Sequence, residues 1–143
     1  MSLRVLIADD NRDAAESLAV LLNLGGDEVL VVGDGSAAVQ AALDWRPDLA
    51  VLDLDMPVMN GFAGAQRQRA EVPDLPIVAL SGYLDDENRA RALAIGFDLC
   101  VTKGGEFADF RRQVDALVKR RAEKRLPTTE ALASADSASP IST

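Results

Sequence analysis

The sequence contains no histidine and only one cysteine, Cys100. Without histidine, the chain lacks the general base of Ser-His-Asp and Cys-His catalysis and the imidazole ligand of many metal sites. A single cysteine excludes an intramolecular disulfide, and we expect Cys100 to be a buried structural thiol.

Positive charge and long apolar runs are scarce as well. The chain has 15 Lys and Arg against 23 Asp and Glu, a net charge of −8, which argues against a general nucleic-acid binder. The only basic cluster, at 119–125, lies at the end of a predicted helix, where it suits the negative helix end. No apolar run approaches the roughly 20 residues of a membrane span, and no signal-peptide pattern follows the apolar start. We expect a cytoplasmic protein without nucleic-acid or membrane partners.

Short apolar runs alternate with helical patterns along the chain. The length of 143 residues suits one domain with its own core. The alternation predicts right-handed βαβ units and a parallel sheet that helices cover on both faces, an α/β fold. The expected strands are residues 4–8, 28–32, 49–53, 77–80 and 99–102. Helices are expected after each strand, the third at about 61–70 and the fourth at 85–95.

Apolar spacing indicates which helix residues face the core. The fourth helix has a thin stripe, Ala90, Leu93 and Ala94, whereas the last has a clear 3.6-residue stripe. The other expected core positions are Leu18, Leu21, Leu22, Val39, Ala42, Leu43, Phe107, Phe110, Val114, Leu117 and Val118. From Pro127 onward, 13 of 17 residues are Ala, Ser, Thr or Pro. We therefore expect a domain at 1–125 and a disordered tail or linker at 126–143.

Chemically active side chains stand at the carboxyl ends of four expected strands. Asp9 and Asp10 follow the first strand, Asp53 ends the third, Ser81 follows the fourth and Lys103 follows the fifth. In open parallel sheets these strand ends share one edge, and ligands bind there. We therefore expect the five side chains to converge.

The chemistry of this set favours phosphoryl transfer. Three adjacent carboxylates repel one another, so one must take up a proton or a divalent cation must neutralise them. An all-oxygen set without histidine favours Mg²⁺, with Mn²⁺ as an alternative. Asp53 is then a candidate nucleophile toward phosphorus, because carboxylates form aspartyl-phosphate intermediates. Lys103 and the Ser81 hydroxyl would stabilise the phosphoryl oxygens.

These residues resemble the receiver domain of response regulators in two-component signalling, particularly chemotaxis-type and hybrid-kinase receivers. The matching features are the Asp-Asp pair after the first strand, the D-L-x-M-P-x-M-N-G run at Asp53 to Gly61, L-S-G-Y after the fourth strand and the lysine after the fifth. They cover about residues 3–125, and four motifs in this order are highly specific. The resemblance implies a flavodoxin-like, doubly wound sheet of five strands in the order 2-1-3-4-5, with five helices.

The resemblance also implies roles. Asp53 would accept a phosphoryl group from a phosphohistidine on a sensor histidine kinase or histidine phosphotransfer protein, and the domain would signal by contact with a downstream protein. Asp10 and Asp53 would ligate Mg²⁺ directly, Asp9 through water, and the backbone carbonyl of Asp55 would be a further ligand. Such a domain catalyses only its own phosphorylation and dephosphorylation and is not an enzyme for other substrates.

Some positions depart from the family pattern. The family has Lys-Pro where this chain has 103–105, Lys-Gly-Gly, which predicts a more mobile last loop. Cys100 stands where many relatives have an aromatic residue that turns inward on switching. We therefore hypothesise that the signal runs through the loop after Ser81 and the fourth helix. Asp55 and Tyr83 flank the site and are candidates to adjust phosphoaspartate hydrolysis, although Asp55 also suits a solvated loop charge.

Two other classes of function stay open. A D-x-D sequence at residues 53–55, with a later Ser and Lys, also resembles haloacid-dehalogenase-type phosphatases. In those enzymes, however, the D-x-D strand comes first and the paired aspartates last, and this chain has no room for a cap domain. A pseudo-receiver that only binds a partner would tolerate the missing proline and aromatic residue, but the intact acidic set argues against it.

Overall fold

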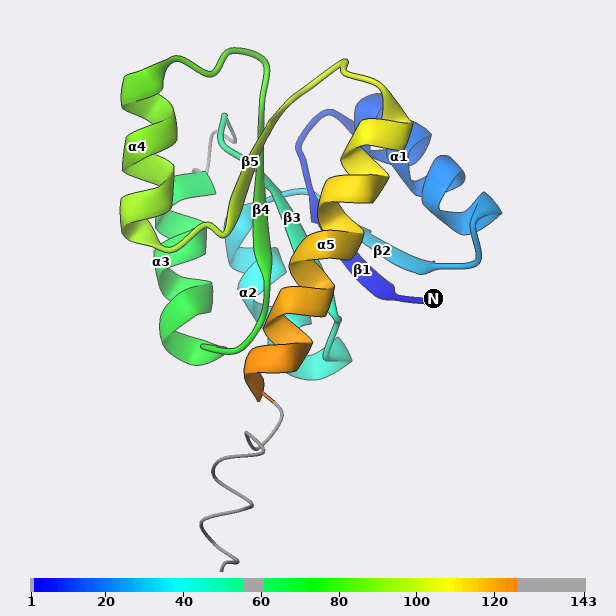
Figure 1. The fold of residues 1–143 in the computed structure, drawn as a ribbon, viewed down its shortest axis with the longest axis horizontal. Helices are drawn as coiled ribbons and strands as arrows, with labels where there is room; N and C mark the ends of the chain where they lie inside the picture. The colour runs from blue at the N-terminus through cyan, green and yellow to red at the C-terminus, as the bar shows by residue number, and fades with distance from the viewer. Residues whose placement is uncertain (1, 56–60, 126–143) are drawn as a thin grey trace, which may run out of the picture.

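The computed structural model describes residues 2–55 and 61–125, and in this part of the chain five strands alternate with five helices (Figure 1). The strands are β1 (Arg4–Ala8), β2 (Glu28–Val32), β3 (Leu49–Asp53), β4 (Ile77–Ser81) and β5 (Leu99–Thr102). The helices are α1 (Arg12–Leu24), α2 (Gly35–Trp45), α3 (Gly61–Glu71), α4 (Asp86–Ile95) and α5 (Phe107–Arg125). The predicted tail at 126–143 and the loop residues 56–60 lie outside the described residues.

All five strands pair in parallel, in the order β2-β1-β3-β4-β5. The central strand is β3, in which Val51 is level with Ile7 of β1 and Val78 of β4. Every residue of β3 and β4 is buried, as expected for strands with helices on both faces. Figure 1 shows α1 and α5 over one face of the sheet and α2, α3 and α4 over the other. The predicted flavodoxin-like architecture and strand order are confirmed.

Alternate strand residues contribute to two cores, one on each face of the sheet. Leu52 and Ile77 belong to the core under α2, α3 and α4, whereas Val51 and Val78 belong to the core under α1 and α5. Cys100 lies in the first of these cores and is 5% exposed. Burial raises the pKa of its thiol, because the charged thiolate is disfavoured away from water. The prediction of a buried structural thiol is confirmed.

Polar side chains cap three of the helices. The side-chain oxygens of Asn11, Asp34 and Asp85 accept hydrogen bonds from the backbone N–H three residues later, at 3.1, 2.7 and 2.7 Å. Asp85 thus precedes α4 instead of beginning it, a one-residue correction to the prediction. Gly96 ends α4 with a φ of +122°, a conformation that favours glycine.

The predicted core stripe of α4 is wrong. Ala90, Leu93 and Ala94 are exposed, and the buried residue is Ala92, with Ile95 half-buried. The helix packs at the edge of the sheet beside β5, so only a narrow face of it is covered. Alanines at positions 90, 92 and 94 offer nearly equal apolar surface to either side, and the sequence pattern therefore did not identify the buried face.

Two further predicted core leucines lie at the surface. Leu21 of α1 and Leu43 of α2 are 42% and 41% exposed. Their neighbours behave as predicted, because Leu22 and Ala42 are buried and Leu18 is half-buried. Each of these two helices therefore covers the sheet with a narrower apolar face than the sequence indicated.

The apolar stripe of α5 is confirmed. Phe107 is half-buried, and the four buried residues of the stripe are Phe110, Val114, Leu117 and Val118. The basic cluster at 119–125 forms the last turns of this helix, as predicted. Among the helices of residues 2–55 and 61–125, none combines the length and apolar character that a membrane span requires.

A buried ion pair joins the α1–β2 connection to α5. The Asp27 side chain is fully buried and pairs with the guanidinium of Arg111, and its Oδ1 accepts a hydrogen bond from the backbone N–H of Leu3 at 2.8 Å. A buried carboxylate requires such partners, because an unpaired buried charge costs several kcal/mol. The pair holds α5 against the residues that lead into β1 and β2.

Gln68 of α3 carries a buried side-chain amide that makes no hydrogen bond within the described part of the chain. Its side chain is 0% exposed, and neither its Nε2 nor its Oε1 has a partner among the described residues. It lies one turn beyond Gly64, where an added Cβ would be 3.5 Å from the Cα of Gly35 in α2. Gln68 therefore lies on the closely packed α2-facing side of α3. An unsatisfied buried amide costs about 1–3 kcal/mol.

We expect Gln68→Met to raise the free energy of unfolding by about 1–2 kcal/mol, because methionine fills a similar volume without buried polar atoms. Urea denaturation followed by far-ultraviolet circular dichroism measures the change. Gln66→Met, at an exposed position of the same helix, is the matched control and should have little effect. A destabilised Gln68→Met variant would show instead that a buried water satisfies the amide.

Candidate functional site

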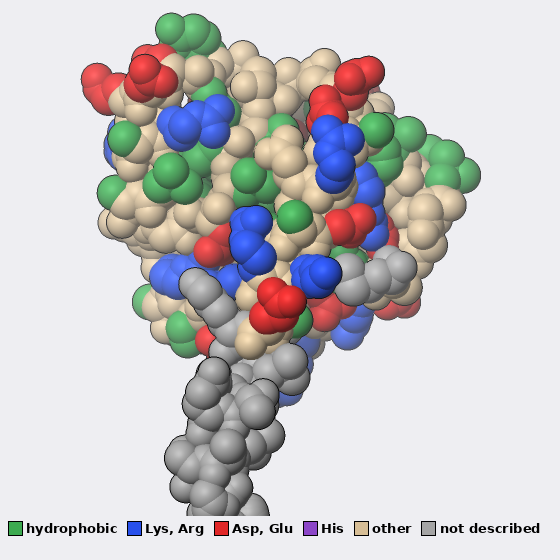
Figure 2. Space-filling model, viewed as in Figure 1, with side chains coloured by type: hydrophobic (Ala, Val, Ile, Leu, Met, Phe, Trp, Pro, Cys, Tyr) green, Lys and Arg blue, Asp and Glu red, His purple; other side chains and the backbone are tan. Residues whose placement is uncertain are grey.

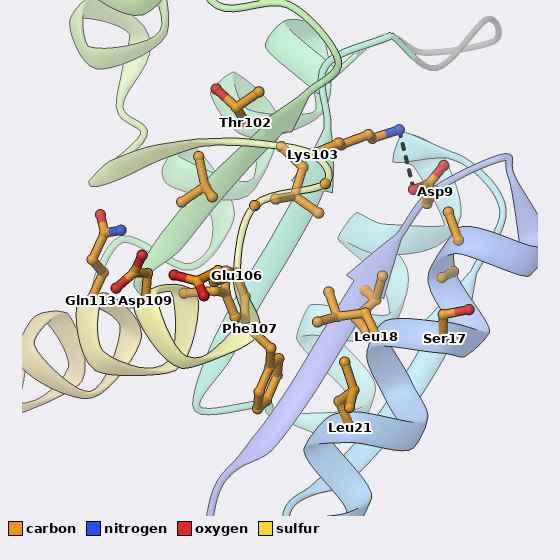
Figure 3. A pocket seen from close by; sticks show the side chains of 18 residues that line it. Asp9, Ser17, Leu18, Leu21, Thr102, Lys103, Glu106, Phe107, Asp109 and Gln113 are labelled. Carbon is orange, nitrogen blue, oxygen red and sulfur yellow. Dashed lines mark ion pairs between the residues drawn. The ribbon is translucent and has the colours of Figure 1, made fainter.

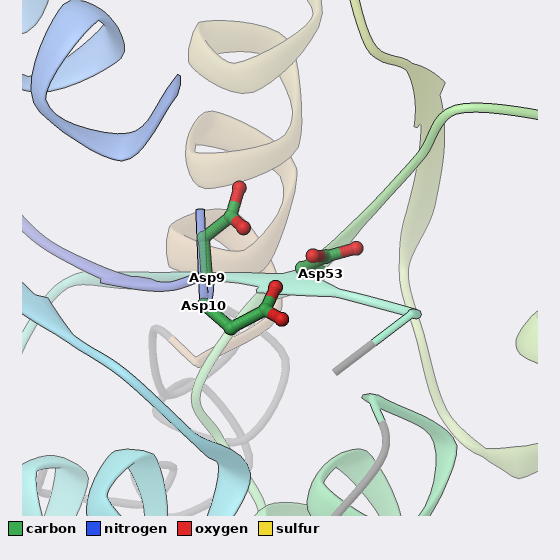
Figure 4. A group of neighbouring side chains, drawn as sticks. All are labelled: Asp9, Asp10 and Asp53. Carbon is green, nitrogen blue, oxygen red and sulfur yellow. The ribbon is translucent and has the colours of Figure 1, made fainter. Parts of the chain in front are cut away.

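The predicted site residues meet at the edge formed by the carboxyl ends of the strands. Asp53 and Ser81 are the last residues of β3 and β4, and Asp9 and Lys103 follow β1 and β5 directly. Oxygens of Asp9, Asp10 and Asp53 lie within 4.8 Å of one another, and Figure 4 shows their carboxylates grouped at this edge. The predicted convergence of the carboxylates is therefore observed.

Backbone hydrogen bonds orient the two buried carboxylates. Asp9 continues the pairing of β1, since its N–H donates to the Val32 carbonyl at 3.1 Å, and its Oδ1 accepts from the Asn11 N–H at 2.9 Å. Asp53 Oδ1 accepts from the Asp55 N–H at 3.0 Å. One oxygen of each carboxylate is thus held by the chain that follows it. The other oxygen is left to face the site.

Lys103 bridges these remaining oxygens. Its Nζ lies 3.1 Å from Asp53 Oδ2 and 3.4 Å from Asp9 Oδ2. The Lys103 N–H donates to the Ser81 carbonyl at 2.8 Å, which carries the β4–β5 pairing one residue further. Gly104 then turns the chain with a φ of +85°, which proline cannot adopt. The departure from Lys-Pro is thus compatible with a lysine that reaches the site.

Burial and neighbouring charges shift the pKa values of Asp9 and Lys103. Burial raises the pKa of Asp9, as do the charge and hydrogen bond of Asp53, whereas the Asn11 N–H and Lys103 act in the opposite direction. Burial lowers the pKa of Lys103, but the hydrogen bonds and charges of Asp53 and Asp9 outweigh this effect and leave it raised. Lys103 is therefore an ammonium at neutral pH, and one ammonium does not balance three carboxylates.

The surroundings of the cluster are also acidic. The first turn of α4 carries Asp86 and Glu87, and the first turn of α5 carries Asp109. Figure 2 shows acidic side chains at the upper ends of the molecule, where these helices begin. Acidic residues suit positive helix N-termini. They also give this edge a negative field that attracts cations.

Ser81 is at the edge, but its hydroxyl is engaged within its own loop. The Oγ donates to the Tyr83 carbonyl at 2.8 Å and accepts from the Tyr83 N–H at 3.2 Å. Tyr83 is 71% exposed, and Asp55 is exposed beside the site. Cys100, in the middle of β5, lies in the core away from the carboxylates.

The sequence did not predict a groove between α1 and α5 that begins at the site. This cavity of about 450 Å³ has an apolar lining that includes Leu18, Leu21 and Phe107, and Asp9 and Lys103 lie at one end (Figure 3). The helical spacing predicted that Leu21 lies in the core, so the sequence contained no sign of exposed apolar surface on this side of α1. The small residues Ala14, Gly104 and Gly105 in the lining are the only hint.

Comparisons with known proteins agree with this geometry. Residues 5–115 match the family model described as the response regulator receiver domain. The transcriptional regulatory protein PrrA of Mycobacterium tuberculosis is 35% identical over 131 residues, which are 92% of this chain and 56% of that protein. The DNA-binding response regulator MtrA of Mycolicibacterium smegmatis is 35% identical, over 87% of this chain and 54% of that protein. The chain spans about half the length of these relatives.

Solved structures show the same fold. The signal receiver domain of a modulated diguanylate cyclase from Desulfovibrio desulfuricans is 28% identical, with a TM-score of 0.77 over 87% of this chain and 100% of that one. A CheY-like receiver domain protein from Methanospirillum hungatei has a TM-score of 0.81 over 87% of this chain and 99% of its own. At 21% identity, this second similarity shows the fold alone.

Proposed function

We propose that Asp53 is the residue on which this chain accepts a phosphoryl group. The chain belongs to the response regulator receiver domain family, and the proposal proceeds from that membership. The observation that carries the proposal is the position of this carboxylate. Asp53 is 2% exposed, lies in the cluster with Asp9 and Asp10, and has its Oδ2 3.1 Å from the Lys103 ammonium. Stoichiometric, magnesium-dependent labelling by acetyl phosphate, detected by intact mass, is the direct test.

The donor set fits a magnesium ion. The three clustered side chains offer only carboxylate oxygens, the ligands that Mg²⁺ prefers, and Mn²⁺ accepts the same set. Asp10 and Asp53 would bind the ion directly and Asp9 through water, with the Asp55 backbone carbonyl as a further ligand. When bound, Mg²⁺ supplies positive charge that offsets the carboxylates and the phosphoryl oxygens.

Asp53, Asp55 and Lys103 then have separate roles in the reaction. Asp53 Oδ2 forms the new bond to phosphorus, the phosphorus–nitrogen bond of a phosphohistidine breaks, and the donor's imidazole leaves. The Asp55 N–H fixes Oδ1, so that Oδ2 faces the donor. The Lys103 ammonium, already beside Asp53 Oδ2, pairs with the charge on the phosphoryl oxygens as they arrive. Because the chain has no histidine, the donor is another molecule.

The Ser81 hydroxyl connects this reaction to the rest of the fold. To contact a phosphoryl oxygen, it must release the Tyr83 carbonyl that it now binds. That exchange rearranges the loop at 82–85 and the start of α4. This geometry supports the hypothesis that the signal leaves the site through α4, and that the buried thiol of Cys100 does not take the role of an inward-turning aromatic ring.

The donor we propose is a sensor histidine kinase or a histidine phosphotransfer protein, and the output is contact with a downstream protein in the cytoplasm. In this role the domain turns over no substrate other than its own phosphoryl group. The family match gives no support to a haloacid-dehalogenase-type phosphatase or to a phosphorylation-independent pseudo-receiver. PrrA and MtrA are named as a transcriptional regulator and a DNA-binding protein, and this chain of net charge −8 spans about half of each, so we propose a protein partner and no nucleic acid for the part described here.

We further propose that Asp55 orients the water that hydrolyses the phosphoaspartate. Asp55→Ala should slow dephosphorylation about fivefold, because the hydrogen bond by which an exposed carboxylate orients the attacking water contributes about 1 kcal/mol. The decay of the phosphorylated mass over time measures the rate, with Tyr83→Ala as a second variant at the site and Asp86→Ala as the control for an exposed acidic residue. An unchanged decay in Asp55→Ala would leave Asp55 as a solvated loop charge.

A further inference from the structure

A cluster of charged residues lies at the amino-terminal ends of β4 and β5, on the opposite side of the sheet's long axis from the site. The proposed reaction does not use these residues. The guanidinium of Arg69, in the last turns of α3, donates to the carbonyls of Leu75 and Gly96 at 2.9 and 2.7 Å and to Asp98 Oδ2 at 2.8 Å. It also donates to the Pro73 carbonyl at 2.6 Å. One side chain thus ties the end of α3 to the connection that leads into β4 and to the connection between α4 and β5.

Asp98 extends this cluster to the sheet and to α5. Its Oδ2 also accepts from the Ile77 N–H at the start of β4, at 2.9 Å. Arg121 of α5 lies 3.7 Å from Asp98 Oδ1 and donates to the Pro73 carbonyl at 3.1 Å. The three charged side chains are 18–23% exposed, so water screens them only in part. We call Arg69, Asp98 and Arg121 together the basal joint.

The basal joint holds the C-terminal end of α4. Gly96 contributes its carbonyl to Arg69, and an added Cβ at this position would lie 3.3 Å from Arg69 Cγ. Phe97 is 3% exposed and donates to the Ala92 carbonyl at 3.1 Å. The Asp98 N–H donates to the Ile77 carbonyl at 2.8 Å. The end of α4 is therefore fixed to α3, α5 and β4 together.

The N-terminal end of α4 is held less firmly. Gly82 and Tyr83 are exposed, and the Asp85 cap binds the N–H of Asn88 within the same helix. The guanidinium of Arg89 reaches the sheet with one hydrogen bond, to the Cys100 carbonyl at 3.3 Å. Leu84 is half-buried against the core, and the other residues of 82–87 are exposed. A segment with one apolar anchor opens at a lower free energy than a fixed one.

We propose that α4 pivots about the basal joint, so that its N-terminal end moves when the Ser81 loop rearranges while its C-terminal end stays in place. This inference deepens the proposed function, because it rests on phosphorylation of Asp53 as the event that moves the loop. The unequal attachment of the two ends of α4 is present in the unphosphorylated protein, and it can be tested there without phosphorylation.

Residue-resolved amide hydrogen exchange of the full chain, measured by NMR, tests the pivot. The reporters at the N-terminal end are the amides of Tyr83, Asn88 and Arg89, and those at the C-terminal end are the amides of Gly96, Phe97 and Asp98. Arg69→Met removes the guanidinium but keeps the aliphatic stem. Arg67→Met, at an exposed position of α3, is the matched control. Each variant is measured alone and with beryllofluoride and Mg²⁺, a stable mimic of an aspartyl phosphate.

In the native chain, beryllofluoride should change exchange at the N-terminal reporters and leave the C-terminal reporters unchanged. Arg69→Met should speed exchange at the C-terminal reporters about tenfold or more, the effect of losing charge-assisted hydrogen bonds, and should extend the response to beryllofluoride to this end. Arg67→Met should match the native chain. Equal responses at both ends, or unchanged C-terminal exchange in Arg69→Met, would overturn the pivot. Absence of phosphate on the acetyl phosphate-treated protein would instead refute the proposed function. The comparison of Arg69→Met with the native chain, both without beryllofluoride, would still test the basal joint.

Discussion

Asp53→Asn should abolish magnesium-dependent incorporation of a phosphoryl group. Asparagine keeps the shape of the side chain and an oxygen for the Asp55 N–H, which now binds Asp53 Oδ1 at 3.0 Å, but an amide is not a nucleophile toward phosphorus. The expected result is complete loss of the added mass after incubation with acetyl phosphate and Mg²⁺. The native chain should gain one phosphoryl group per molecule.

The matched control is Asp86→Asn, which removes a negative charge from the first turn of α4. Asp86 is exposed and lies outside the carboxylate cluster, so this variant should be labelled like the native chain. Labelling of Asp53→Asn with normal stoichiometry would mean that another carboxylate of the cluster is the acceptor. Turnover of a generic phosphomonoester by the native chain would favour the phosphatase alternative.

Lys103→Met should slow phosphorylation by about 10²–10³-fold, the usual effect of removing one preorganised group that stabilises charge in the transition state. Lys103 lies 3.1 Å from Asp53 Oδ2, so its ammonium is already placed where the phosphoryl oxygens arrive. Quenched-flow mixing with acetyl phosphate, followed by intact mass, gives the rate. Lys119→Met, an exposed position on α5, controls for loss of one positive charge.

The same variant should bind Mg²⁺ more tightly. Lys103 neutralises part of the charge on Asp9 and Asp53, so its removal leaves three carboxylates whose repulsion only a cation or a proton relieves. Titration calorimetry measures the affinity. Slow phosphorylation together with tighter Mg²⁺ binding would show that Lys103 acts in phosphoryl transfer and does not help to hold the metal. Weaker Mg²⁺ binding would show that Lys103 organises the carboxylates instead.

Much of the architecture and the site could be predicted from the sequence, because the signals involved are local. Four consecutive apolar residues before Asp53 indicate a strand covered on both faces, and the same argument applies to the strand that ends at Ser81. Parallel strands place their carboxyl ends at one edge whatever the details of packing. Asp9, Asp53 and Lys103 were therefore expected together, and they are.

Other features depended on how the layers pack. The buried face of α4 is set by the position of the helix beside β5, which alanine spacing does not encode. The exposure of Leu21 and the groove beside it depend on the separation of α1 and α5. The burial of Gln68 depends on the close approach of α3 to α2, where Gly64 lies against Gly35.

The sequence by itself determined the order of strands and helices, the two-sided burial of the central strands and the identity of the groups at their carboxyl ends, since each is encoded within a few consecutive residues. Only the tertiary structure decided which charged residues pair across the fold. Asp27 and Arg111 are 84 positions apart, and Arg69 and Asp98 are 29 apart. No local sequence pattern identifies such partners, because every exposed arginine of a helix fits the helical periodicity equally well. Their pairing follows from the distances between helices, which the packing of both cores sets together.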